Sequence, residues 1–264
     1  MEMNEYFFPF GQKLKRIQQA DRTPKEAFVL GVYASAVHAQ WIDKEGKQKI
    51  AALAVASEPS IFWTGESAEK IISSIIIHEE IGKLKLPIDK HLNGPSGRAL
   101  DNLFLKPLGL RRENTWLCDL LPESRVNENQ RKAIEKHYTD HFIKRYNLTA
   151  ATVPNFDKSE LNSSIRRLEI LEELETSKAE TLILLGDLPV YWFLRFHDIR
   201  FKKLSDFGNS QESYGREHEI KINNRIYRVI PLCHPRQAQR LGRSNDKWNR
   251  FHNNWVEQRL TNLQ

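Results

Sequence analysis

Four short apolar runs, each ending in residues suited to chemistry, constrain the fold of this chain more than any other feature. They span residues 28–35, 115–119, 181–187 and 227–235. Each has the length and apolar character of a buried strand. In an open parallel sheet, the loops at the carboxyl ends of the strands build the ligand site. We therefore expect Ser35, Asp119, Asp187 and His234 to share one crevice.

The segments between these runs have helical character. We expect helices at residues 66–84, 97–105, 127–146, 159–177 and 245–259, and a strand at 51–57 beside the first run. Strands that alternate with helices predict an α/β fold, a three-layer α/β/α sandwich with a mainly parallel central sheet. A chain of 264 residues suits one domain, residues 1–264.

Composition limits the class of partner and compartment. The chain has 40 basic and 34 acidic residues, a net charge of +6 that permits a polyanionic partner without requiring one. Its two cysteines lie in predicted strands, which favours a reducing compartment and argues against a disulfide or metal framework. Charged residues interrupt the first 20 positions, so we expect neither a signal peptide nor a membrane span. We expect a cytoplasmic monomer without a metal or cofactor.

Four motifs occur in an order that resembles the uracil-DNA glycosylase superfamily. They are Gly31–Ser35, Asn93–Asp101, Trp116–Pro122 and Leu232–Pro235. The last resembles the family's His-Pro-Ser motif, and Asp119 ends the strand whose last polar residue reads the base. The resemblance implies a DNA glycosylase that flips a nucleotide out of double-stranded DNA and hydrolyses the base–sugar bond. Residues around 42–87 have no counterpart in this resemblance and are interpreted as an insertion.

The first motif departs from the family pattern. Val32 and Tyr33 stand where family members hold a carboxylate or amide that positions water. Water positioning then falls to Ser35, His38 or Glu58, or the protein is a catalytically silent module that binds a modified base. Two cysteines are too few for the iron–sulfur cluster of some branches.

Asp119 and His234 indicate the base. Uracil excision typically uses Asn where this chain has Asp119. A carboxylate accepts from an exocyclic amino group, which cytosine has and uracil lacks. A protonated Asp119, favoured by burial, would share its proton with the ring nitrogen. A neutral His234 would donate to the base carbonyl as charge builds there. Ser35 is small where the family's Tyr excludes substituents at carbon 5.

The substrate that these residues favour is a 5-substituted cytosine, such as the hydroxymethylated or glucosylated cytosine of phage DNA, and the role an anti-phage defence. Excision of uracil or another deaminated base is the alternative within the class, and a nuclease or small-molecule hydrolase is a further one. For single residues, Asp119 could instead cap a turn or pair with Arg125, and His234 could be an ordinary surface histidine.

The remaining candidates line the pocket or contact DNA. Tyr33 and Val32 would shape the pocket wall, Phe62 or Trp63 would stack on the flipped base, and Leu92 stands where the family has a stacking Phe. The alternative for the two rings is core packing. The expected DNA contacts are Ser96, Arg98, Arg236, Arg240 and Arg243 to phosphates and Gln237 or Leu241 as the wedge. A solvated basic loop is the alternative for the stretch 236–243.

Overall fold

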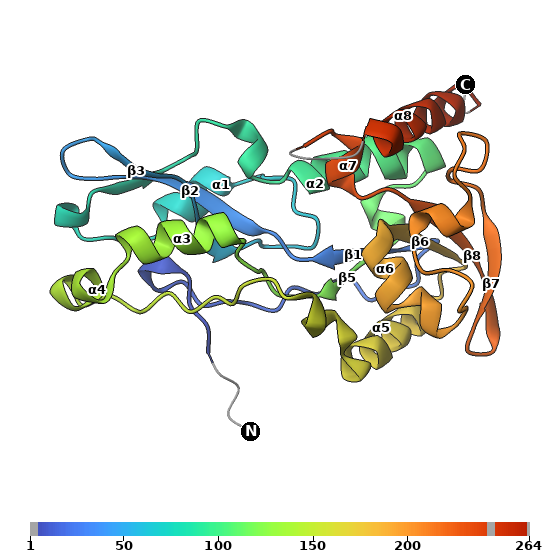
Figure 1. Cartoon of the computed structure of the whole chain (residues 1–264), viewed down its shortest axis with the longest axis horizontal. Coiled ribbons are helices and arrows are strands. Elements are labelled where there is room, and N and C mark those ends of the chain that lie inside the picture. Colours follow the sequence, from blue (N-terminus) through green and yellow to red (C-terminus); the bar gives the residue numbers. More distant parts are fainter. Residues whose placement is uncertain (1–4, 242–245, 263–264) are drawn as a thin grey trace. The chain divides into compact units, whose positions relative to one another are not determined.

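The computed structural model describes residues 5–241 and 246–262, which divide into two compact units (Figure 1). Each unit is built from segments that are not contiguous in sequence. The first contains residues 5–17, 34–95 and 122–158. The second contains residues 18–33, 96–121 and 159–262 apart from the gap. Residues 42–87, predicted as an insertion, all belong to the first unit.

The second unit contains the sheet that the apolar runs predicted. Its strand order is β5-β1-β6-β8-β7. β5, β1, β6 and β8 are parallel to their neighbours, and only the edge strand β7 is antiparallel. The bounds are β1 Ala27–Tyr33, β5 Thr115–Leu121, β6 Thr181–Leu185, β7 His218–Ile222 and β8 Arg225–Leu232. The mainly parallel sheet confirms the predicted α/β class.

Helices flank this sheet, with α5 on one side and α8 on the other (Figure 1). The helices are α2 Pro95–Ala99, α5 Ser164–Ser177, α6 Asp187–Trp192, α7 Pro235–Ala238 and α8 Asp246–Thr261. α2 continues into the π-helical turn η4, Leu100–Leu105. α5 begins where the Ser163 side chain caps the backbone N–H of Arg166. The shorter turns are η5 Lys106–Leu108, η6 Arg112–Asn114, η7 Lys158–Asn162, η8 Leu194–Phe196 and η9 Leu204–Phe207.

Strand alternation divides the side chains of β5 between the two faces of the sheet. Trp116 stacks near Phe28 of β1, with ring centroids 6.4 Å apart, and bonds to Glu173 of α5. Trp116 and Cys118 therefore face α5. Asp119 follows in the strand, so its side chain points to the opposite face, next to its register partner Gly31.

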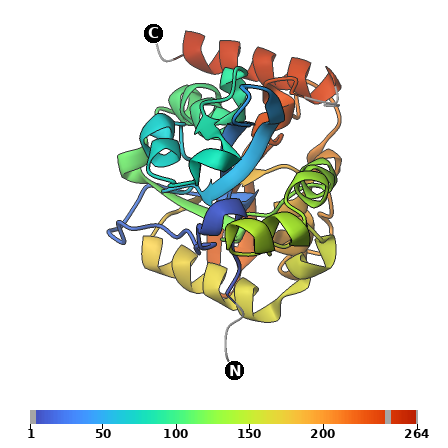
Figure 2. The same cartoon turned by 90° about the vertical axis from the view of Figure 1, so that its left-hand side faces the viewer.

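The first unit has a separate antiparallel sheet with the order β3-β2-β4. Its strands are β2 Ala36–Ile42, β3 Gln48–Ser57 and β4 Lys83–Lys85, and its helices are α1 Ala68–Ser73, α3 Glu128–His137 and α4 Asp140–Tyr146. Three short turns complete it: η1 Pro9–Gly11, η2 Glu79–Ile81 and η3 Lys90–Leu92. α3 packs on β3, and α1 on β2 and β4 (Figure 2).

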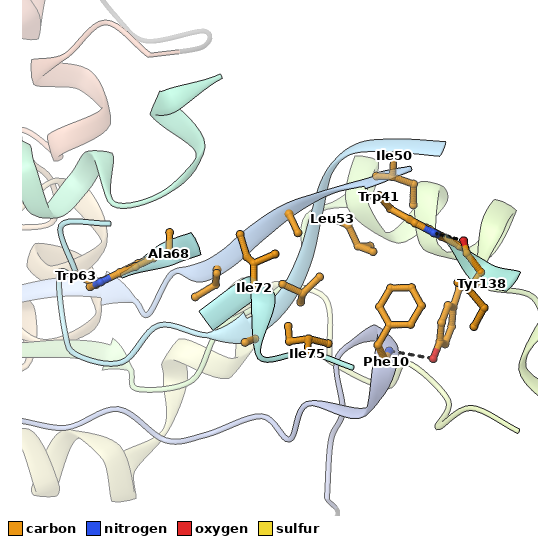
Figure 3. Packing of buried hydrophobic residues seen from close by; sticks show 14 residues of the cluster. Phe10, Trp41, Ile50, Leu53, Trp63, Ala68, Ile72, Ile75 and Tyr138 are labelled. Carbon is orange, nitrogen blue, oxygen red and sulfur yellow. Dashed lines mark hydrogen bonds between the residues drawn. The ribbon is translucent and has the colours of Figure 1, made fainter. Parts of the chain in front are cut away.

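Two predictions for the first unit were wrong. The strand at 51–57 does not join the first run, because β3 pairs with β2 in this second sheet. Only residues 68–73 of the expected helix 66–84 form an α-helix, and the segment then turns into β4. A cluster of buried side chains, with Phe10 and Tyr138 edge to face beside Trp41, forms the core here (Figure 3). No helix within the described ranges has the length and apolar character that crossing a membrane requires.

Candidate functional site

The carboxyl edge of the five-stranded sheet is the natural place for a ligand in the second unit. The chain leaves β1 toward β5 on one side and later returns to β6 on the other, so the strand order reverses beside β1. Open α/β sheets bind ligands at such a reversal. Tyr33 ends β1, Asp187 follows β6, Asp119 lies near the end of β5 and His234 follows β8. Ser35 belongs to the first unit.

Asp119 is a buried acid with a hydrogen-bonded backbone. Only 4% of the residue is exposed. Burial raises the pKa of its carboxyl group to about 7, against the opposing charge of Arg166 and with a smaller contribution from Glu173. Its backbone oxygen accepts from Nη2 of Arg166 at 2.7 Å. Its carboxyl group forms no hydrogen bond with any residue that the structure describes. Arg125, the alternative partner, pairs with Glu123 at 3.8 Å.

His234 is held as a neutral imidazole of defined tautomer. It is the N-cap of α7, where its Nδ1 accepts from the backbone N–H of Arg236 at 3.2 Å. Its own backbone N–H donates to Oε1 of Gln237 at 3.1 Å. Burial, aided by the charge of Arg236, lowers the pKa of His234 to about 4. Because Nδ1 accepts, the ring proton is on Nε2, which makes Nε2 a hydrogen-bond donor.

A buried chain of hydrogen bonds supports the segment before His234. Nε2 of His252 faces the carbonyl oxygen of Leu103 at 2.9 Å, and a carbonyl only accepts, so Nε2 carries the proton. Nδ1 of His252 therefore accepts from the Tyr214 hydroxyl at 2.7 Å. The Tyr214 oxygen in turn accepts from the backbone N–H of Cys233 at 2.9 Å. The sequence analysis missed Tyr214 and His252, because neither belongs to a motif.

The charges of two other candidate residues, Arg236 and Asp119, affect the pKa of Tyr33. Burial raises the pKa of its hydroxyl, the charge of Arg236 opposes this, and the charge of Asp119 adds to it. Its side chain is nevertheless part-exposed, with 38% of the residue accessible. The preceding Val32 is buried and, by strand alternation, faces the other side of the sheet. Tyr33, Asp119 and Arg236 thus surround one part of the carboxyl edge.

The predicted DNA contacts of the second unit differ in exposure. Arg236 and Arg240 are exposed, and Arg240 pairs with Asp246 at 2.9 Å. Leu241 is partly buried, and its backbone N–H donates to the oxygen of Arg236 at 2.9 Å. The Gln237 side chain, the other predicted wedge, is engaged as the cap partner of His234.

Three further DNA contacts were predicted, at Ser96, Arg98 and Arg243. Ser96 and Arg98 are partly buried in α2, and the backbone oxygen of Arg98 accepts from Nδ2 of Asn102 at 2.9 Å. Arg243 lies outside the described residues.

The first unit holds the candidates for water positioning. Glu58 is buried, and its Oε1 accepts from the backbone N–H of Ser35 at 3.0 Å. The Ser35 carbonyl accepts from the Ser124 hydroxyl. Asn93 pairs with both backbone groups of His38, at 2.8 and 2.9 Å, and burial lowers the pKa of His38 to about 4. These bonds fix the backbone of both Ser35 and His38.

The two predicted stacking rings are buried in the first unit. Trp63 lies in the core cluster with Ala68 and Ile72, and its Nε1 donates to the oxygen of Glu66 at 2.8 Å (Figure 3). Its burial favours the alternative of core packing. Phe62 is also buried, with a left-handed backbone of φ 50°. Leu92, at the end of η3, is partly buried.

Among the described residues, no group of three or more His, Cys, Asp and Glu side chains is arranged to hold a metal ion. Cys118 and Cys233 are both buried free thiols. No family model matches the sequence, and no curated protein matches it either.

Proposed function

We propose that this protein is a monofunctional DNA glycosylase that excises a 5-substituted cytosine and leaves an abasic site. One observation carries the proposal. Asp119, a buried acid with a pKa near 7 whose carboxyl group has no hydrogen-bond partner among the described residues, lies at the same sheet edge as His234, a neutral donor. Together they offer an acid for the ring nitrogen of a cytosine and a donor for its carbonyl oxygen.

The chemistry follows from where charge develops. As the bond between the sugar carbon and the base nitrogen breaks, its electron pair moves onto the base and leaves a cationic sugar. Protonated Asp119 gives its proton to the ring nitrogen, and Nε2–H of His234 donates to the base oxygen. A water molecule then adds to the cationic sugar carbon and releases a proton to solvent, which completes the hydrolysis.

The proposed partner is double-stranded DNA, which the exposed Arg236 and Arg240 and the net charge of +6 would favour. We propose that the protein acts as a monomer in the cytoplasm, where buried free thiols stay reduced. Defence against phages with modified cytosines is the proposed role, and repair of deaminated bases is the alternative.

Base release from matched duplexes tests the proposal. Four duplexes differ at one position, which holds uracil, cytosine, 5-hydroxymethylcytosine or its glucosylated form. Chromatography measures the released base, and alkaline cleavage measures abasic sites. We expect release from the 5-substituted cytosines alone, and none with a His234→Ala variant. Release of uracil alone would favour repair, binding without release a silent module, and strand cleavage without release a nuclease; each would overturn the proposal.

A further inference from the structure

A buried network of charges lies on the face of β5 opposite to the Asp119 side chain. Arg166 and Glu173 of α5 pair at 3.0 Å, and both side chains are at least 90% shielded from solvent. The second carboxylate oxygen of Glu173 accepts from the Trp116 indole at 3.0 Å. Arg166 also pairs with Glu169 at 3.0 Å, near the surface. Buried ion pairs add little to stability on average, so this network suggests another role.

Arg166 also contacts the backbone of Asp119 and the neighbouring thiol of Cys118. Its Nη2 donates to the backbone oxygen of Asp119 at 2.7 Å and contacts Sγ of Cys118 at 3.1 Å. A guanidinium presents its donors in a rigid plane. Because Nη2 makes both of these contacts and Nη1 pairs with Glu173, the guanidinium has little freedom to move. The carbonyl that Arg166 holds belongs to the residue whose side chain emerges on the other face.

We infer that Arg166 is a positioning residue for Asp119: from the α5 face it anchors the Asp119 carbonyl, and with Glu173 it sets the charge balance behind the carboxyl group. Only the rate measurements that test this inference rest on the proposed function. The charge balance can be measured in the absence of any substrate.

The charged and titratable groups that face Asp119 act in opposite directions. From α5, the positive charge of Arg166 lowers the pKa of Asp119 and the negative charge of Glu173 raises it. From β1, Tyr33 is close enough for its hydroxyl to sense Asp119, and Arg236 lies near Tyr33. Cys118 precedes Asp119 in β5, and burial keeps its thiol protonated by raising its pKa. Arg166 and Glu173 are therefore the pair to vary.

Direct titration of Asp119 tests the charge balance. Carboxyl carbon resonances of labelled aspartate are followed from pH 4 to 9 in the full chain, with Asp119→Asn to identify the signal. We expect Arg166→Gln to raise the Asp119 midpoint and Glu173→Gln to lower it, each by roughly one pH unit. Glu169→Gln is the matched control, since it removes a carboxylate that pairs with the same Arg166 nearer the surface, and should leave the midpoint unchanged. Unmoved midpoints in both test variants would overturn the inference.

A second pair of variants separates anchoring from charge and guards against misfolding. Arg166→Met combined with Glu173→Gln removes both charges and keeps an acceptor for Trp116, so it should fold with a near-native Asp119 midpoint. We expect its base release to fall at least tenfold, and Arg166→Lys to recover part of it. Full activity of the folded double variant would show that the network is only structural. A wild-type protein without base release but with the expected midpoint shifts would refute the proposed function and leave the charge balance standing.

Discussion

At the scale of single residues, the proposed chemistry depends on the two protonation states available to Asp119. A pKa near 7 means that both the acid and the carboxylate are present at neutral pH. The acid can donate to a ring nitrogen, and the carboxylate can only accept. Asn offers a fixed donor and acceptor instead. Asp119 therefore determines base preference as well as rate.

Replacing Asp119 with Asn should shift the preference of the protein from 5-substituted cytosine toward uracil. The amide of Asn donates to the second carbonyl of uracil and accepts from its ring N–H, whereas it can give no proton to cytosine. We expect release of 5-substituted cytosine to fall by roughly 100- to 10,000-fold, because a mismatched base leaves buried polar groups unpaired. Uracil release should rise. Comparing kcat/KM on paired duplexes measures the exchange, and an unchanged preference would reject this role for Asp119.

The pH dependence of base release should follow the protonated form of Asp119. Its raised pKa keeps the carboxyl group neutral below about 7. His234, with a pKa of about 4, is already neutral above pH 5 and adds no change there. We expect kcat/KM to be level from pH 5 to 6 and to fall about tenfold per pH unit above 7. The same measurement on uracil with Asp119→Asn should be flat, and a rate that rises with pH would contradict the assignment.

At the scale of elements, the turn between β6 and α6 sets the place of His234. Gly186 has a φ of +91°, which side chains other than glycine rarely adopt, and a Cβ there would lie 3.2 Å from Cβ of His234. Its backbone N–H donates to the oxygen of Leu232 at 2.8 Å, which ties the ends of β6 and β8 together. A side chain at this position strains the turn and presses on His234.

Gly186→Ala should therefore lower the rate beyond its effect on stability. The left-handed backbone alone would cost roughly 1–2 kcal/mol. Gly109→Ala is the matched control, since Gly109 has a φ of +68° and nothing lies within 4 Å of the added Cβ. We expect the larger loss of unfolding free energy in urea for Gly186→Ala, whose added Cβ meets His234, and at least a tenfold lower kcat for that variant alone. Equal kcat in the two variants would show that the turn does not position His234.

Elements whose pattern is local could be predicted, and those fixed by distant partners could not. The apolar runs predicted the parallel strands, because a strand buried on both faces is apolar throughout. α5 shows the limit. The helix was predicted, but hydropathy misplaces its faces: Leu168 is 66% exposed, whereas Arg166 and Glu173 are buried. Their mutual pairing and the bonds to Trp116 and Asp119 offset the desolvation of two charges, and hydropathy alone cannot reveal such partners.

The sequence pattern did not predict the first unit as a separate unit, for a related reason. β1 and β2 are separated only by Ala34 and Ser35, so residues 28–42 look like one long run. β2 pairs with β3 and β4 rather than with the strands of the parallel sheet. Nothing in the local pattern shows that the chain changes sheets after Tyr33. The division of the candidate residues could not be predicted for the same reason: Ser35 and Glu58 belong to this unit, and Asp119 and His234 to the other.

At the scale of the whole molecule, the three histidines whose pKa values are lowered most distribute acid sensitivity over both units. His38 belongs to the first unit, and His234 and His252 to the second. Burial lowers the pKa of each to about 4. An unfolded chain binds these protons near pH 6.5, so stability is lost as the pH falls from 6.5 toward 4. Asp119 acts oppositely, because its raised pKa favours the folded state as the pH falls below 7.

Acidification from pH 7 to 5 should therefore weaken both units by about the same amount, but through different groups. Each histidine should cost about 2 kcal/mol over this range, and Asp119 should return a similar amount in the second unit. We expect a loss of about 2 kcal/mol in both units, from one histidine in the first and from two histidines less Asp119 in the second. Hydrogen exchange of peptides from each unit, corrected for intrinsic rates, measures this. His38→Gln should abolish the loss in the first unit alone, and His252→Gln should reduce it only in the second. Equal protection at the two pH values would show that these imidazoles become charged without opening the fold.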